Sequence, residues 1–214
     1  KGVRLLEMQL FRDTLACYSE LPQGSFEASI ATEEAMETAK SMISKSTDKY
    51  YRTQVQLLLA ESMLHASKIH RSHGKYDMAL KFANNGLALL DNSSEDIEET
   101  PHDKYLKSQL CFAIGSIKAI RDEDHPEAVE WYTKARSAVV GSNFITPLYS
   151  NQGHGQMYVS MGLSYWEVGE QEKAIKVTQT GANLMKQAVE SGSLQLQAMA
   201  VPYGNLATMH GKLG

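Results

Sequence analysis

Cysteine, proline and long apolar runs are scarce in this 214-residue chain, and each shortage excludes a class of protein. The two cysteines, Cys17 and Cys111, stand far apart in dissimilar surroundings. Such a pair forms neither a disulfide framework nor a zinc-binding pattern, and it favours a cytoplasmic or other reducing intracellular compartment. No apolar run approaches the roughly 18 residues that indicate a membrane-spanning helix, and no segment has the features of a signal peptide.

An excess of positive charge is also missing. The chain has 21 Lys and Arg against 25 Asp and Glu, a formal net charge of −4. Binding to nucleic acid or to an anionic membrane needs concentrated positive charge, and no stripe of the sequence supplies it. We therefore expect neither of these as a partner. Because the first residue is Lys1 rather than Met, we expect the chain to be a piece of a longer protein.

What the sequence does contain is a repeat. The segments ALKFANNGLALL (79–90), AVEWYTKARSAV (128–139) and AIKVTQTGANLM (174–185) share one pattern of apolar and small residues. Their leading alanines lie 49 and 46 residues apart. With only 5 prolines and few β-branched runs, each repeat is expected to be a pair of antiparallel helices. The predicted units are 1–46, 47–99, 100–145, 146–192 and a partial unit 193–214, together forming one domain over 1–214.

Turn and cap residues mark the ends of these helices. Turns are predicted at 72–77, 121–127 and 167–172, with Gly74 and Gly169 as left-handed C-caps. Thr100-Pro101 and Thr146-Pro147 each combine an N-cap threonine with a proline at the first helical position. Asp124 is expected in the N-cap region of the helix that follows it, and Pro202 is expected to kink the last helix.

Glycine inside a helical stripe needs a physical reason, because it costs a helix interior up to about 1 kcal/mol relative to alanine. In YVSMGLSYWEVGEQEKAI (158–175), Gly162 lies among large aromatic and apolar residues. We predict that Gly162 and Ala174 face each other where two helices cross most closely.

These residues resemble the tetratricopeptide repeat family. The resemblance is carried by Tyr158, Met161, Gly162, Tyr165, Gly169 and Ala174, by Gly74, Tyr76 and Ala79, and by the partial copies. It implies an all-α solenoid, a right-handed superhelix of helix pairs that works as a noncatalytic protein-interaction scaffold. The period of 45–49 departs from the family's usual period of about 34 residues and is similar to that of its long-repeat scaffold members.

The resemblance also implies a concave groove lined by the first helix of each unit. In one register this groove has an apolar centre and a basic end, and it would suit an amphipathic protein or peptide segment with an acidic end. The predicted partner-binding residues are Leu64, Lys68, Arg71, Phe112, Ser116, Val159, Leu163 and Trp166. The same stripe would equally well pack against the next unit, and the sequence leaves that alternative open.

One family function is disfavoured. Domains that clamp the C-terminal carboxylate of heat-shock chaperones need Asn and Lys or Arg at fixed slots of the first helices. The matching slots here hold Glu61, His65, Gln109, Ala113, Gln156 and Ser160, and only Asn205 fits. A chaperone C-terminus is therefore not the expected partner.

The sequence offers no constellation for catalysis, a metal or a cofactor. His65, His70 and His73 are close in sequence, but His70 occupies a repeated packing position. The Gly153-His154-Gly155 stretch lacks the strand and the Gly-Lys-Ser/Thr of a phosphate-binding loop and is interpreted as a flexible first helical turn. The acidic segment 91–103 is interpreted as a solvated loop, in which Ser93 is a candidate for acid-directed phosphorylation.

We therefore expect no enzyme. Two alternatives to the groove remain: an architectural subunit that uses an apolar convex patch around Trp131 and Tyr132, and a peptide-sensing regulatory domain.

Overall fold

The computed structural model describes the chain except residues 1, 20, 22–24, 94–98, 140–150 and 214; the side chains of 2–5, 16, 18, 19, 92, 93 and 151–154 also lie outside the description. The described residues form α-helices and one short 3-10 helix, with no strand among them. The helices are α1 (Gly2–Ser19), α2 (Phe26–Ser44), α3 (Lys49–Ser72), α4 (Tyr76–Ser93), α5 (Pro101–Arg121), α6 (His125–Val139), α7 (Asn151–Glu167), α8 (Gln171–Glu190), η1 (Leu196–Met199) and α9 (Ala200–Leu213). The fold is therefore all-α, as expected. None of these helices, over the described residues, is both long and apolar enough to cross a membrane.

Two turns between paired helices are built in the same way. Gly74 (φ +70°) and Gly169 (φ +84°) adopt the left-handed conformation that glycine enters without strain. In each turn the following amide reaches back five residues, from Lys75 N to His70 O and from Glu170 N to Tyr165 O, at 2.9 Å in both. These bonds satisfy carbonyls that the helix end leaves open. Both predicted C-caps are confirmed.

The predicted N-caps of α5 and α6 are confirmed as well. Thr100 Oγ1 accepts a hydrogen bond from Asp103 N at 3.3 Å, and the Asp103 carboxylate accepts one from Thr100 N at 2.8 Å. This reciprocal pair is a capping box with Asp in the place of Glu. Asp124 Oδ1 accepts from Glu127 N at 3.0 Å and so caps α6. The matching Thr146-Pro147 lies outside the described residues.

Pro202, expected to kink the last helix, lies near the start of that helix, just after a change of helix type. The 3-10 helix η1 ends at Met199 and α9 begins at Ala200, so Pro202 is the third residue of α9. In the first turn an amide has no intrahelical acceptor, and a proline there removes no hydrogen bond.

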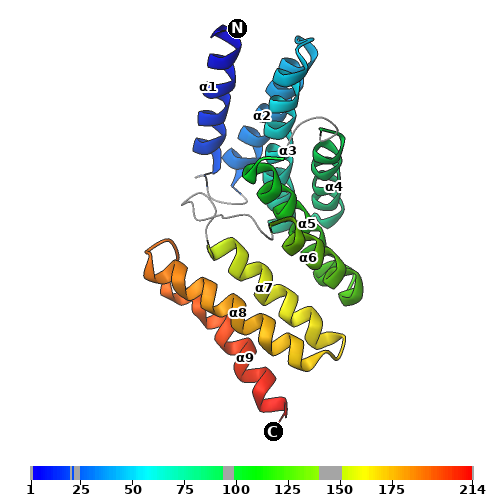
Figure 1. Ribbon diagram of the computed structural model, residues 1–214, viewed down its shortest axis with the longest axis vertical. Coiled ribbons are helices and arrows are strands. Elements are labelled where there is room, and N and C mark those ends of the chain that lie inside the picture. The colour runs from blue at the N-terminus through cyan, green and yellow to red at the C-terminus, as the bar shows by residue number, and fades with distance from the viewer. Residues whose placement is uncertain (1, 20, 22–24, 94–98, 140–150, 214) are drawn as a thin grey trace. The chain divides into compact units, whose positions relative to one another are not determined.

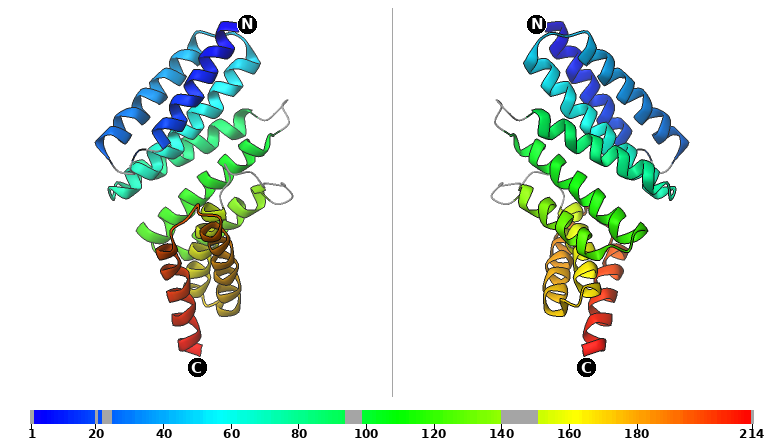
Figure 2. Two further views of the ribbon diagram at one scale, coloured as in Figure 1. Left: turned by 90° about the vertical axis from the view of Figure 1, so that its left-hand side faces the viewer. Right: turned by 90° about the vertical axis from the view of Figure 1, so that its right-hand side faces the viewer.

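The chain divides into two compact units, residues 1–117 and 118–214, with the boundary inside α5. Unit 1 is built around a core shared by α1, α2 and α3, which lie alongside one another (Figure 2). The buried core residues are Met8, Phe11, Leu15, Ala35, Met36, Ala39, Tyr51, Val55, Leu58, Leu59 and Ala66. The helices of the first two predicted sequence units, 1–46 and 47–99, all fall within their expected bounds.

Unit 2 depends on the close crossing of α7 and α8, which run alongside each other (Figure 1). A Cβ atom at Gly162 would collide with Thr178 Oγ1 and would lie 3.0 Å from the carbonyl oxygen of Ala174. Further along, a Cβ at Gly155 would lie 2.9 Å from Gly181 O, and one at Gly181 would lie 2.7 Å from Gly155 O. The predicted approach of Gly162 to Ala174 is thus confirmed. Gly155, expected in a flexible first turn, is instead buried at this crossing.

Replacing Gly162 by alanine should therefore destabilise the protein, because its methyl group overlaps Thr178. We expect a loss of about 1–3 kcal/mol in the free energy of unfolding, typical of an overpacked interior, measured by urea titration followed by circular dichroism. Gly204→Ala is the matched control: this helical glycine is exposed and nothing lies within 4 Å of its added Cβ. It should raise stability by up to about 1 kcal/mol. Equal effects of the two substitutions would contradict the crossing.

Candidate functional site

The first helices of successive pairs, α1, α3 and α5, are joined through polar side chains in unit 1. Arg12 Nη2 donates to Gln54 Oε1 at 2.9 Å, which links α1 to α3. His102 Nε2 lies 3.6 Å from Glu61 Oε2, and Arg71 Nη1 donates to Ser116 Oγ at 2.5 Å. The last two contacts join α3 and α5 at two separate points. Because residue numbers rise along both helices from one contact to the other, α3 and α5 run in the same direction.

Between these two contacts lies a set of polar side chains that we name the α3–α5 strip. On α3, Glu61, His65 and Lys68 are spaced i, i+4, i+7 and therefore lie along one side of the helix. On α5, His102, Gln109 and Ser116 are spaced seven apart and lie along one side in the same way. Gln109 is thus level with the stretch of α3 that carries His65 and Lys68. The strip is Glu61, His65, Lys68, Arg71, His102, Gln109 and Ser116.

The middle of the strip is cationic and partly dehydrated. Burial lowers the pKa of Lys68, the neighbouring Arg71 lowers it further, and Glu61 opposes both effects. Burial also lowers the pKa of His65, with Lys68 as the second cause. Over the described residues Lys68 is half-buried and forms no ion pair within 4.0 Å. The charged form of a partly buried lysine is stabilised when an anion approaches it.

Gln109 adds a second unsatisfied donor. Its side chain is 5% exposed, and its Nε2 has no hydrogen-bond partner in the part of the chain that the structure describes. Leaving a buried donor unpaired costs about 1–3 kcal/mol. Arg71, which already donates to Ser116, lies on the same stretch. The strip therefore holds a half-buried ammonium at Lys68 and, at Gln109, a buried N–H donor without an acceptor among the described residues.

At the other end of the strip, Glu61 and His102 form a partly exposed ion pair. The hydrogen bond to Glu61 raises the pKa of His102, against an opposing effect of burial. Burial raises the pKa of Glu61, but His102, His65 and Arg12 together outweigh it, and the net result is a lowered pKa. The negative charge at this end of the strip is thus paired with a positive one, whereas Lys68 at the centre has no ion-pair partner among the described residues.

The structure distributes the eight predicted partner-binding residues unevenly. Lys68, Arg71 and Ser116 come together in the strip, and Phe112 is half-buried on α5. Leu64 is only 4% exposed, so its side chain packs inside unit 1. In unit 2, Val159 is 5% exposed and belongs to the core, and Leu163 is 42% exposed. Trp166 is half-buried, with Lys212 Nζ 5.9 Å from its ring centroid.

Sequence reasoning missed Glu61, His65, His102 and Gln109 as members of a site. Three of them occupy slots of the chaperone clamp, and they do not match its Asn and Lys pattern. The i, i+4, i+7 spacing on α3 and the spacing of seven on α5 were the available signals.

The other sequence candidates are placed as follows. His70 stacks on Phe82 with ring centroids 5.2 Å apart, in agreement with its expected packing role. Within the described ranges no three His, Cys, Asp or Glu side chains gather as a metal site would require. Ser93 and the middle of the acidic segment lie outside the described side chains. Cys17 is exposed and Cys111 is buried.

The apolar patch expected around Trp131 and Tyr132 is not formed by these residues. Tyr132 is 1% exposed and fills the interior. Trp131 is half-buried, donates from Nε1 to Glu127 Oε1 at 3.2 Å and carries Lys134 Nζ 4.1 Å above its ring. These two side chains therefore do not form the exposed apolar patch that would favour the architectural alternative.

Replacing His102 by glutamine should destabilise the protein in a narrow pH range. A raised histidine pKa stabilises the folded state below about pH 6.5, the unfolded value, and this contribution is lost as pH rises through the folded pKa. The pKa of Glu61 is lowered, so its ionised carboxylate contributes its full stabilisation down to about pH 4.5, the ordinary value for this side chain. The wild type should exceed His102→Gln by up to about 1 kcal/mol near pH 5.5, the size typical of an exposed pair.

The measurement is urea unfolding of both proteins near pH 5.5 and near pH 8.5, with the difference shrinking at the higher pH. The exposed His210→Gln serves as the control and should show no such pattern. A difference that is constant with pH would mean that the pair contributes nothing in its charged form.

The comparisons with known proteins concern the fold alone. Neither a protein-family model nor a curated protein matches the sequence. Among solved structures, the crystal structure of BtubC (BKLC) from P. vanneervenii is similar, with a TM-score of 0.60 and 14% sequence identity. The match covers 86% of this chain and 65% of BtubC, so the chain spans less than two thirds of that protein's length. At this identity the likeness shows a shared helical fold.

Proposed function

We propose that the chain is a noncatalytic protein-interaction scaffold that holds an acidic helical or extended segment of a partner against the α3–α5 strip. The observation that carries the proposal is the half-buried Lys68, which has no ion pair among the described residues and lies level with the unpaired Nε2 of Gln109. A carboxylate of a partner would neutralise Lys68, and it would accept a hydrogen bond from Gln109 Nε2 once the side chains that cover this amide move aside. Charge-assisted hydrogen bonds of this kind contribute about 1.5–3 kcal/mol each.

The chemistry of the strip favours binding over catalysis. Its centre holds donors and positive charge, while its one carboxylate, Glu61, is engaged by His102. Nothing in this set provides a nucleophile with an adjacent base. The half-buried Phe112 lies three residues beyond Gln109 on α5 and offers an apolar surface beside the donors. An acidic residue followed by an apolar one would fit this arrangement.

The family-level part of the proposal is the tetratricopeptide-like superhelix. It is supported by the repeated Gly-turn geometry at Gly74 and Gly169 and by the side-by-side first helices in unit 1. A right-handed solenoid follows from the same resemblance, as does a groove that runs along the first helices. An architectural subunit and a peptide-sensing regulatory domain are the alternatives to this proposal, and Trp131 and Tyr132 do not supply the exposed apolar patch that would favour the first of them.

Neutralising Lys68 should weaken binding of an acidic segment. The probe is a fluorescein-labelled amphipathic peptide of about 15 residues with three Glu at one end, compared with its Gln-substituted twin. We expect Lys68→Gln to raise the Kd for the acidic peptide at least tenfold, which corresponds to about 1.4 kcal/mol, in a fluorescence anisotropy titration. Lys81→Gln, an exposed lysine on α4, removes the same charge elsewhere and should change the Kd less than twofold. Equal loss in both variants would indicate a nonspecific charge effect and would contradict the site.

Gln109→Met should separate function from stability. Methionine replaces the buried amide by an apolar side chain of similar volume, so the unpaired Nε2 and its desolvation cost disappear. We expect unfolding by urea to occur at an equal or higher concentration than in the wild type. The affinity for the acidic peptide should nevertheless fall about threefold to tenfold, because a donor is lost. A variant that is destabilised but binds normally would show that Gln109 is structural only.

A further inference from the structure

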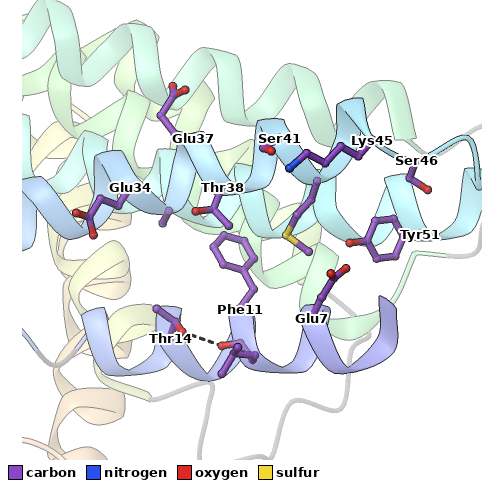
Figure 3. A pocket seen from close by; sticks show the side chains of 13 residues that line it. Glu7, Phe11, Thr14, Glu34, Glu37, Thr38, Ser41, Lys45, Ser46 and Tyr51 are labelled. Carbon is purple, nitrogen blue, oxygen red and sulfur yellow. Dashed lines mark hydrogen bonds between the residues drawn. The ribbon is translucent and has the colours of Figure 1, made fainter. Parts of the chain in front are cut away.

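A second surface of unit 1 lies between α1 and α2 and has the opposite charge. It is a cleft of about 650 Å³ whose floor includes Phe11, Ala35, Met42 and Tyr51. Phe11 points from α1 toward α2, with Glu34 toward one end of the cleft and Lys45 toward the other (Figure 3). Three of the four floor residues are buried and Met42 is partly buried. The cleft is therefore an apolar channel between two helices.

α1 leaves an apolar edge uncovered beside this channel. Met8, Phe11 and Leu15, at i, i+3, i+7, are buried and attach α1 to the core. Leu6 and Leu10, at i, i+4 on a neighbouring line, are 74% and 67% exposed, and Leu10 lines the cleft. Two leucines one turn apart are what an apolar face of another helix would cover.

The length of the cleft favours a helix over a compact ligand. Its lining on α2 runs from Glu34 to Met42, which spans about 12 Å at 1.5 Å per residue, and Lys45 and Ser46 continue it just beyond the end of α2. On α1 it runs from Glu7 to Thr14, about 10 Å. A channel of this length between two helices accommodates roughly two turns of a third helix.

Charge at the rim selects the chemistry of that helix. Glu7, Glu34 and Glu37 line the cleft, against Lys45 as the one cation among the described lining residues. Glu37 pairs with the exposed Lys40 at 2.7 Å, whereas Glu7 and Glu34 have no such partner within the described residues. The apolar floor is thus bordered by a net negative rim.

We propose that the α1–α2 cleft docks a cationic amphipathic helix of a partner protein. One bulky apolar side chain of that helix packs over Phe11 and Met42, and a second apolar side chain of the same helix packs against Leu10. Lysine or arginine residues on its flank approach Glu34 at one end and Glu7 at the other (Figure 3). Charge complementarity gives specificity and association rate, and the apolar floor gives most of the affinity. The partner is opposite in charge to the acidic segment of the α3–α5 strip, so one unit carries two distinct docking surfaces.

The test uses two fluorescein-labelled helical peptides of about 18 residues with the same leucine stripe, one with lysine and one with glutamate on the flanks. Binding to the whole chain is followed by fluorescence anisotropy. We expect the lysine peptide to bind at least tenfold more tightly than the glutamate peptide. The double variant Glu7→Lys/Glu34→Lys, which reverses the two exposed rim carboxylates that have no ion pair among the described residues, should weaken the lysine peptide at least tenfold. Its control, Glu167→Lys/Glu172→Lys, makes the same charge change at exposed positions of unit 2 and should leave the Kd within twofold.

Two further variants distinguish the cleft from the α3–α5 strip and from a self-association surface. Leu10→Ser changes an exposed side chain, so it should keep the wild-type helicity and still weaken the lysine peptide severalfold. Lys68→Gln should leave lysine-peptide binding unchanged, because the strip is a separate surface. The proposal is overturned if the lysine peptide fails to bind, or if both charge-reversed proteins bind it equally. It is also overturned if sedimentation shows a dimer of this chain that Leu10→Ser abolishes and the lysine peptide does not displace, since a second copy would then be the occupant.

Discussion

The close approach of paired helices, made possible by small residues at the crossing, is the constraint on which the rest of this protein depends. The repeat places Gly86, Ala135 and Gly181 at corresponding positions, and all three are buried. A Cβ at Gly86 would lie 3.0 Å from Leu110 Cδ2 and 3.4 Å from Ala60 O, so a larger residue would push α4 away from its neighbours. Helix propensity alone would favour alanine at each site. Where glycine stands instead, tight packing between helices offsets its conformational cost.

Once the pairs are held together in this way, the side chains that remain outside the crossings determine what the surface can bind. In unit 1 the line of first helices carries a basic centre at Lys68 and Arg71, and the cleft beside α1 carries an acidic rim at Glu7 and Glu34. Both surfaces have apolar residues next to their charges. This combination is typical of segment recognition, in which buried apolar contacts give affinity and charges select the partner. A lysine that served only to keep the surface hydrated would be fully exposed, because partial burial of its charge costs free energy.

Helix ends and helix crossings could be predicted from the sequence, while the set of residues in the proposed binding face could not. Gly74, Gly169 and Asp124 act within a few residues of themselves, and such local geometry is encoded locally. The Gly162 crossing was also predictable, because a glycine within a large apolar stripe mainly serves close helix packing. The face of α3 that we propose for binding is different: Leu64 and His65 are adjacent in sequence and point in directions about 100° apart. Which of them is buried depends on how α3 packs against its neighbours, and that information is tertiary.

Gln109 shows why a departure from good packing is informative. Its amide is buried on α5, and over the described residues its Nε2 is unpaired, although a methionine or leucine would fill the same space without that cost. Most interior positions agree with stability, and those that do not tend to serve binding or catalysis. Gln109 falls between the two points where α5 contacts α3, and the stretch of α3 between these points carries Lys68, whose pKa is lowered by its own burial. An anionic partner would relieve both at once, and this coincidence is a stronger indication of a binding site than either residue alone.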